Sequence, residues 1–117
     1  MGASVIHGQR LLKKRIRCSD GNEVEELRAE EGDSVNMAYS SISRMVAFCA
    51  ERGVSESDWP IYYGTWEGDA DLADVVARCD LLRQSLKPLD ESECASVTWL
   101  ATVRTWLAQG EVFAIFE

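Results

Sequence analysis

The sequence predicts an α+β fold, or a small α/β fold, formed by one compact domain over residues 1–117. The chain has 117 residues, 46% of them hydrophobic, which is enough for one core and hardly for two. Several segments place apolar residues at helical spacing, while residues 112–116 form an unbroken apolar run of strand-forming character. We therefore expect three main helices packed on a small sheet of about three or four strands, which includes the N- and C-terminal strands.

The first third of the chain is predicted to be mainly extended. Residues 4–6 suggest a short strand, and residues 11–18 a second extended segment that the turn-prone residues 19–22 close. Residues 23–31 suggest a brief helix, because two apolar residues in it are three positions apart, and Gly32 ends it.

The next segment has a clearer helical period. Asp33 or Ser34 is suited to cap this helix, and Gly53 to stop it. The apolar residues that would share one helical face are Val35, Ala38, Tyr39, Ile42, Met45, Val46 and Cys49.

A further helix is predicted over about residues 71–86. Acidic residues crowd its start and Arg83 and Lys87 are near its end, which matches the helix dipole at both ends. Its inner face would consist of Leu72, Val75, Val76, Cys79, Leu82 and Leu86.

The last predicted helix runs from Asp90 to Gly110. Asp90 followed three residues later by Glu93 resembles a capping box. The segment is apolar over most of its circumference, which indicates burial in the core or against a partner. A homodimer with Trp99 and Trp106 in its interface is the alternative to core packing.

The cysteines indicate a reduced, cytoplasmic compartment. Their spacing contains no CxxC pair, and three of the four fall on apolar faces of predicted helices, where free cysteine packs as a small hydrophobe. The longest hydrophobic run is about six residues, far below the ~20 that span a bilayer, and residues 1–6 are too short for the apolar core of an export signal. We therefore expect a soluble protein with no membrane contact.

The net charge of −8 conceals an asymmetry between the start of the chain and the rest. The first 19 residues carry +5 and no acid, which leaves −13 for the remainder. A nucleic-acid-binding arm is one interpretation, but the acidic remainder would repel phosphates, and we expect no nucleic-acid partner. The basic segment could instead lie against the protein's own carboxylates, an acidic partner or a second subunit. Its cations are Arg10, Lys13, Lys14, Arg15 and Arg17.

Residues with catalytic chemistry are sparse. His7 is the only histidine, so any Ser-His-Asp or Cys-His arrangement would need it. The sequence contains no GxGxxG, GxxxxGK[ST], GxSxG or HExxH motif. The acidic run Glu67, Asp69, Asp71 and Asp74 suits helix capping better than cation binding. We assign no catalytic residue, no metal ligand and no cofactor.

The most informative segment is the loop from Gly53 to Gly68. It concentrates four of the chain's seven Trp and Tyr residues within eight positions, and such side chains dominate binding hot spots. Acidic residues flank them, with no cation between Arg52 and Arg78. The candidate partner-binding residues are Trp59, Tyr62, Tyr63 and Trp66, with Asp58, Glu67 and Asp69 as the acidic rim. The alternative interpretation is that these rings pack the loop onto the core.

These features predict a small acidic intracellular binding protein that docks on a basic protein partner. An inhibitor of the immunity or anti-defence type would fit this description, either as a monomer or as a homodimer. A second hypothesis is a small-ligand-binding or enzymatic domain whose pocket is bordered by the loop 53–68.

Overall fold

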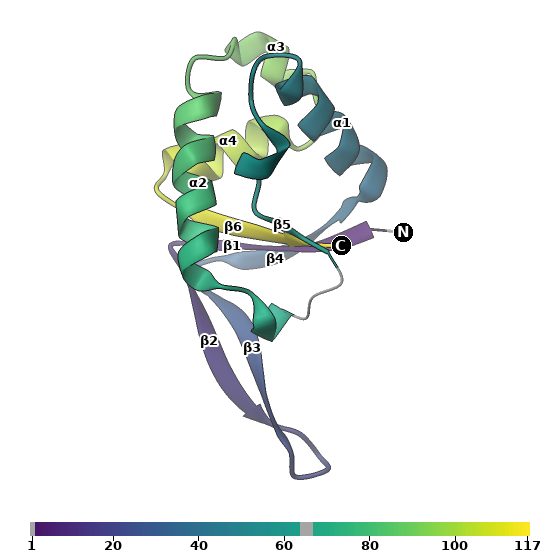
Figure 1. Cartoon of the computed structure of the whole chain (residues 1–117), viewed down its shortest axis with the longest axis vertical. Coiled ribbons are helices and arrows are strands. Elements are labelled where there is room, and N and C mark those ends of the chain that lie inside the picture. The colour runs from purple at the N-terminus through teal and green to yellow at the C-terminus, as the bar shows by residue number, and fades with distance from the viewer. Residues whose placement is uncertain (1, 64–66) are drawn as a thin grey trace.

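A computed structural model, which describes residues 2–63 and 67–117, shows the predicted α+β fold (Figure 1). The strands are β1 (Gly2–Gly8), β2 (Arg10–Arg17), β3 (Glu23–Glu30), β4 (Asp33–Ala38), β5 (Ile61–Tyr62) and β6 (Val112–Phe116). The α-helices are α1 (Tyr39–Ala50), α2 (Leu72–Leu86), α3 (Glu91–Ala95) and α4 (Leu100–Ala108). Two short 3₁₀ helices, η1 (Glu56–Asp58) and η2 (Glu67–Asp69), flank β5 in the sequence.

The main sheet has four strands in the order β4-β1-β6-β5. Strand β1 pairs antiparallel with both β4 and β6, and the two residues of β5 pair parallel with β6. All five residues of β6 are buried. A central strand that is covered on both faces requires a continuous apolar sequence, as predicted for residues 112–116.

The first four strands form one long antiparallel ribbon that bends near Gly8 and Gly32. His7 pairs with Asp33 before the bend, and Arg10 pairs with Glu30 beyond it. The backbones approach so closely here that a Cβ atom on Gly32 would collide with the carbonyl oxygen of His7. Beyond the bend, β2 and β3 leave the sheet as a projecting two-stranded hairpin, which we call the arm (Figure 1).

The prediction of a brief helix over residues 23–31 was wrong, because this segment is strand β3. Every residue from Glu23 to Glu30 pairs with a residue of β2. Two apolar residues three positions apart are too weak a signal of a helix to outweigh strand pairing, and of these two only Leu27 is fully buried.

The basic N-terminal segment lies against the protein's own carboxylates, which was one of the predicted alternatives. Strand β2 carries the cations and strand β3 the acids, so that opposite charges face each other along the arm. Arg10 Nε is 2.7 Å from Glu30 Oε2, and Arg15 Nη1 is 3.7 Å from Glu23 Oε2. The positive charge of the N-terminal segment is therefore compensated by the acids of β3 within one hairpin.

The hydrophobic core joins the sheet to the layers on both of its faces. The helices α1, α3 and α4 and most of α2 lie on one side of the sheet, and the arm extends on the other side, where η2 lies beside it (Figure 1). Val5, Phe113 and Ile115 are fully buried in the sheet. Leu27 of the arm and Ala70, which follows η2, belong to the same buried cluster. The arm is thus anchored at its base and exposed toward its tip.

The first long helix begins later than predicted, at Tyr39 instead of about residue 35. Val35 pairs with Val5 in the sheet, so the residues before Tyr39 are strand β4. Asp33 does not cap the helix; its carboxylate accepts a hydrogen bond from the amide of Ser34. Val35 and Ala38 are three positions apart and so extended the helical spacing of α1 backward, whereas the buried residue of β4 is Met37.

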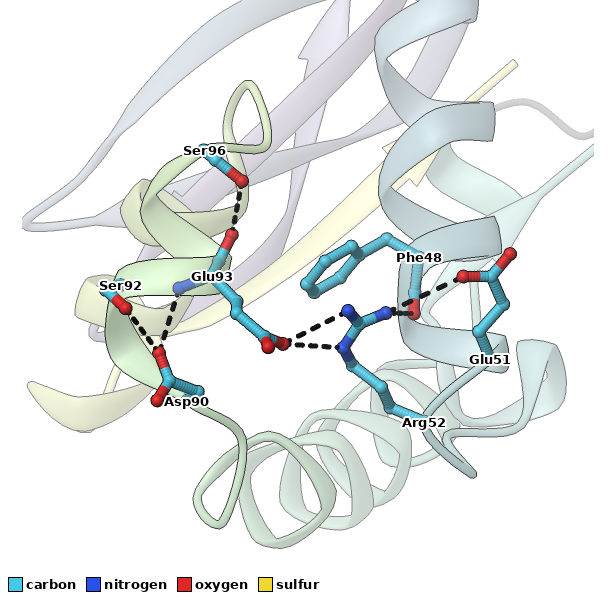
Figure 2. A network of polar contacts seen from close by, with 7 residues as sticks. All are labelled: Phe48, Glu51, Arg52, Asp90, Ser92, Glu93 and Ser96. Atoms are coloured by element: carbon cyan, nitrogen blue, oxygen red, sulfur yellow. Dashed lines mark hydrogen bonds and ion pairs between the residues drawn. The ribbon is translucent and has the colours of Figure 1, made fainter.

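The predicted helix from Asp90 to Gly110 is divided into α3 and α4. Asp90 caps α3 as predicted, since its side chain accepts from the amide of Glu93 at 3.0 Å. The Glu93 carboxylate binds Arg52 at the end of α1, as Figure 2 shows. Trp99 has a φ of 71°, which interrupts the helix immediately before Leu100. Trp106 is 7% exposed, so the core-packing alternative holds for this side chain.

The bounds of helix α2 match the prediction closely, with Asp71 as its cap. Val76, which was predicted on its inner face, is instead 46% exposed. The three cysteines predicted to pack in helices, Cys49, Cys79 and Cys94, are buried with free thiols. Within residues 2–63 and 67–117, no helix has the length and apolar character needed to cross a membrane.

Candidate functional site

The loop 53–68 follows α1 and returns the chain to the sheet. Gly53 adopts a φ of 85°, which favours glycine and turns the chain away from the helix. Ser55 then caps η1 by accepting from the amide of Ser57. The next residues enter the core as the short strand β5, beside β6. The described part of the loop is therefore held by local capping near its start and by strand pairing at β5.

Trp59 lies in the core, with none of its surface exposed. Its ring meets Phe113 edge to face, with the ring centroids 6.4 Å apart. The core-packing interpretation applies to this residue, which presents no surface to a partner in this conformation. The indole Nε1 is buried without a hydrogen-bond partner among the described residues.

Tyr62 is half-buried and fixes the loop to α2. Its hydroxyl donates to Asp74 Oδ2 at 2.9 Å, and its ring stacks on Phe116. The same Asp74 oxygen is 2.9 Å from Nε of Arg78. A second nitrogen of Arg78, Nη1, donates to the carbonyl oxygen of Trp59 at 3.0 Å. Burial, followed by the hydrogen bond to Asp74, raises the pKa of the Tyr62 phenol. These contacts make Tyr62 a structural residue of the loop.

Tyr63 is the exposed aromatic residue of the described loop, with 61% of its surface accessible. Partial desolvation and the carboxylates of Glu117 and Glu56 raise the pKa of its phenol. These two carboxylates come from η1 and from the residue after β6. Glu56 lines one cleft with Tyr63, and the Glu117 amide donates to the carbonyl oxygen of Tyr62 at 3.1 Å, so both acids are near the exposed ring. We call Glu56, Tyr63 and Glu117 the acidic patch.

The remaining predicted residues do not all join this patch. Asp58 is half-buried in η1, next to Glu56 in the same turn. Asp69 is exposed in η2, which packs against β3 of the arm. Glu67 begins η2, and Trp66 is outside the described residues. The structure therefore divides the predicted site among the core (Trp59), the contact of Tyr62 with α2, the acidic patch, and η2 packed against β3 of the arm.

Positive charge near the patch is already neutralised. Arg78 is the only cation between Arg52 and Arg83 in the sequence. Its guanidinium is bound by Asp74 and by a backbone carbonyl, so it is not available to Glu56 or Glu117 as an ion-pair partner within 4 Å. The patch thus keeps its negative charge.

An open cleft of about 500 Å³ adjoins the patch. Its walls combine an acid, a hydroxyl, two aromatic residues and one arginine. They are Glu56, Ser57, Trp59, Ile61, Tyr63 and Arg78. A side chain from a partner, or a small polar ligand, could contact Tyr63 and Glu56 from this cleft.

His7 belongs to a separate buried cluster. Its Nδ1 is 2.8 Å from Glu111 Oε1, and its ring lies flat on Trp106 at a centroid distance of 3.9 Å. The described residues place no serine, threonine or cysteine in hydrogen-bond contact with this ring, and they contain no group of three His, Cys, Asp or Glu residues suited to a metal. The cluster joins β1 to the start of β6 and has the character of a structural contact.

Comparison with protein-family models, with curated proteins and with solved structures finds no match to this chain. Two residues of the site could not have been assigned from the sequence. Glu117 reaches Tyr63 only because β5 pairs with β6, a long-range contact without a local signal. For Arg78 the sequence offered only its isolation among acids, which does not show which carboxylate it binds.

Proposed function

We propose that this protein is a binding protein that docks on a basic protein partner through the acidic patch. The observation that carries the proposal is the exposed ring of Tyr63, which lines one cleft with Glu56 and follows Tyr62, whose carbonyl oxygen accepts from the Glu117 amide at 3.1 Å. Tyrosine supplies contact area at a low entropic cost and is enriched in binding hot spots. Carboxylates at its rim favour cationic partners and speed their association.

The distribution of charge outside the arm supports the same proposal. Residues 10–30 contain six basic and five acidic residues, a net charge of +1, so the rest of the chain, with six basic and 15 acidic residues, has a net charge of −9. Arginines in that part are largely occupied: Arg52 by Glu93, Arg78 by Asp74 and Arg83 by Asp80. A field of one sign that is not compensated internally steers partners of the opposite sign.

We also propose that docking inhibits the partner, as in proteins of the immunity or anti-defence type, and that it takes place in the cytoplasm. A basic surface is typical of proteins that bind nucleic acid. Covering such a surface with an acidic protein would block access to it. The free, buried cysteines are compatible with a reducing compartment.

A matched pair of charge reversals tests the proposal. Glu56 and Glu91 are both exposed acids in the first turn of a short helix, but only Glu56 belongs to the acidic patch. Proteins that co-purify with the wild-type chain from a lysate of its source cells would be identified, purified and titrated with each variant. We expect Glu56→Lys to weaken capture of a basic partner and Glu91→Lys to leave it unchanged. Equal effects of both reversals would reject the patch.

A second candidate function is the binding of a small ligand in the cleft beside Tyr63. Trp59 lines this cleft, and its indole Nε1 is buried without a hydrogen-bond partner among the described residues, whereas such groups are normally hydrogen-bonded. A ligand that enters the cleft and reaches this atom after a small shift of the loop would satisfy it. A thermal-shift panel of metabolites and nucleotides separates the two functions. A true ligand at 100 times its Kd would stabilise the fold by about 2.7 kcal/mol.

A further inference from the structure

A second groove lies between α2 and α4, away from the acidic patch. It has a volume of about 350 Å³ and an apolar floor. Its lining residues are Arg83, Leu86, Lys87, Arg104, Leu107 and Ala108. Lys87 is nine residues beyond Arg78, or two and a half turns at about 3.6 residues per turn. It therefore lies on the opposite side of α2 from Arg78, which holds the loop 53–68.

The charge of this groove is opposite to that of the protein. Outside the arm the chain has six cations, and three of them line this groove together with no acidic residue. Scattered cations on a protein of net charge −8 would be expected to lie among its many acids. Their concentration over an apolar floor therefore defines a local site for an anion.

Two of the three cations have capacity for a ligand. Within residues 2–63 and 67–117, Lys87 makes no ion pair within 4 Å, and Arg104 makes one hydrogen bond, from Nη2 to the carbonyl oxygen of Leu89 at 3.3 Å. A guanidinium has five N–H donors, so most of those on Arg104 remain free. The Asp90 Oδ1 atom accepts from the Ser92 hydroxyl and the Glu93 amide, and among the described residues Asp90 forms no ion pair with Arg104 within 4 Å.

Arg83 differs from the other two because it is a fixed wall of the groove. It donates to the carbonyl oxygens of Leu107 and Glu111 at 2.8 and 3.0 Å, and to Asp80. These bonds hold α2 against the C-terminal end of α4 and keep the groove's shape. The floor is equally rigid, since Leu86 and Leu107 are each 2% exposed.

We propose that this groove binds a small anionic amphiphile, a free carboxylate with an aliphatic body, with its head group between Lys87 and Arg104. The apolar floor accepts the aliphatic body, and the two cations form charge-assisted hydrogen bonds to the carboxylate. The volume is near the lower end of the range for small-molecule sites, ~300–1,000 Å³, which favours a single short chain over a larger ligand. This site is independent of the acidic patch.

The test uses the full chain and decanoate, with decanol as the uncharged probe of the same chain length. Titration followed by amide chemical shifts is expected to move signals of the second half of α2 and of α4, with decanoate binding about tenfold more tightly than decanol. Lys87→Gln is expected to weaken decanoate binding about tenfold. Arg44→Gln, which removes an exposed cation on α1, is expected to leave it unchanged.

A second variant tests the shape of the groove without changing its charge. Ala108 is exposed and lines the groove, so Ala108→Phe is expected to fill the groove without disturbing the core and to abolish decanoate binding. Equal binding of decanoate and decanol, an unchanged Kd in Lys87→Gln, retained binding in Ala108→Phe, or shifts confined to other elements would each overturn the proposal. Loss of partner capture in the acidic-patch variants would not affect this result.

Discussion

Arg78 Nε is 2.9 Å from Asp74 Oδ2, one turn earlier on the same helix. This pair has two effects on the candidate site. It fixes the loop 53–68, because Arg78 also binds the carbonyl oxygen of Trp59 and Asp74 also binds the hydroxyl of Tyr62. It also removes the one nearby cation that could neutralise the acidic patch.

Arg78→Met is expected to loosen the loop. The substitution leaves the buried Trp59 carbonyl and the Asp74 carboxylate without their guanidinium partner, at a cost of about 1–3 kcal/mol. Urea denaturation followed by Trp fluorescence measures the change in the free energy of unfolding. Arg44→Met, at an exposed position of α1, is the control and should change stability by less than about 0.5 kcal/mol. Equal urea midpoints for Arg78→Met and Arg44→Met would show that Arg78 does not hold the loop.

Tyr62 is expected to make stability depend on alkaline pH. Its raised pKa means that the folded protein keeps the phenol proton at a pH where the unfolded chain loses it. The contribution is fully present below the ordinary tyrosine pKa, about 10, and is lost as the pH rises above it. Tyr62→Phe should therefore reduce the fall in stability above about pH 10, in denaturation curves measured at several pH values. The same slope in both proteins would show that Tyr62 ionises freely in the folded state.

The bend in the ribbon depends on Gly32. A Cβ at this position would collide with the His7 backbone, so Gly32→Ala is expected to destabilise the fold by about 3 kcal/mol, as severe overpacking does. Gly21 has a φ of 87° and open space around it, and Gly21→Ala should cost only the backbone penalty of about 1 kcal/mol. Thermal or urea denaturation compares the two. A smaller loss in Gly32→Ala than in Gly21→Ala would show that the ribbon can bend elsewhere.

The thiols are expected to differ sharply in reactivity. Burial raises the pKa of Cys79 to about 11, and burial together with the neighbouring Cys94 raises that of Cys49 to about 11. Cys18 is half-exposed near the tip of the arm. A chromogenic disulfide reagent near pH 8 should therefore modify one thiol rapidly in the folded protein and all four in urea. Rapid reaction of more than one thiol without urea would indicate that the helical layer opens.

The fold was predictable where a local pattern coincided with the tertiary structure. The continuous apolar residues of β6 and the charged ends of α2 are such cases, since burial on both faces and the helix dipole both leave a signature in sequence. The break at Trp99 leaves no such signature, because a non-glycine residue with a positive φ depends on the packing around it. Strand β3 was missed because its partner, and not its own period, determines its structure.

The candidate site was predictable in composition but not in geometry. The loop's aromatic and acidic residues were evident, yet the sequence could not show that Trp59 is buried while Tyr63 is exposed. That difference depends on the register of β5 beside β6, where Ile61 pairs with Ile115. The cationic groove was missed for a similar reason, since Lys87 and Arg104 become neighbours only when α2 packs on α4.

The central claim is that Tyr63 anchors a basic partner. The most direct measurement is the Kd of the purified captured partner for wild-type protein and for Tyr63→Ala, with circular dichroism and a melting curve to verify the fold. Because Tyr63 is exposed, the variant should fold normally, and loss of a hot spot should weaken binding by about 2 kcal/mol, roughly 30-fold. An unchanged Kd in a folded Tyr63→Ala variant would contradict the account.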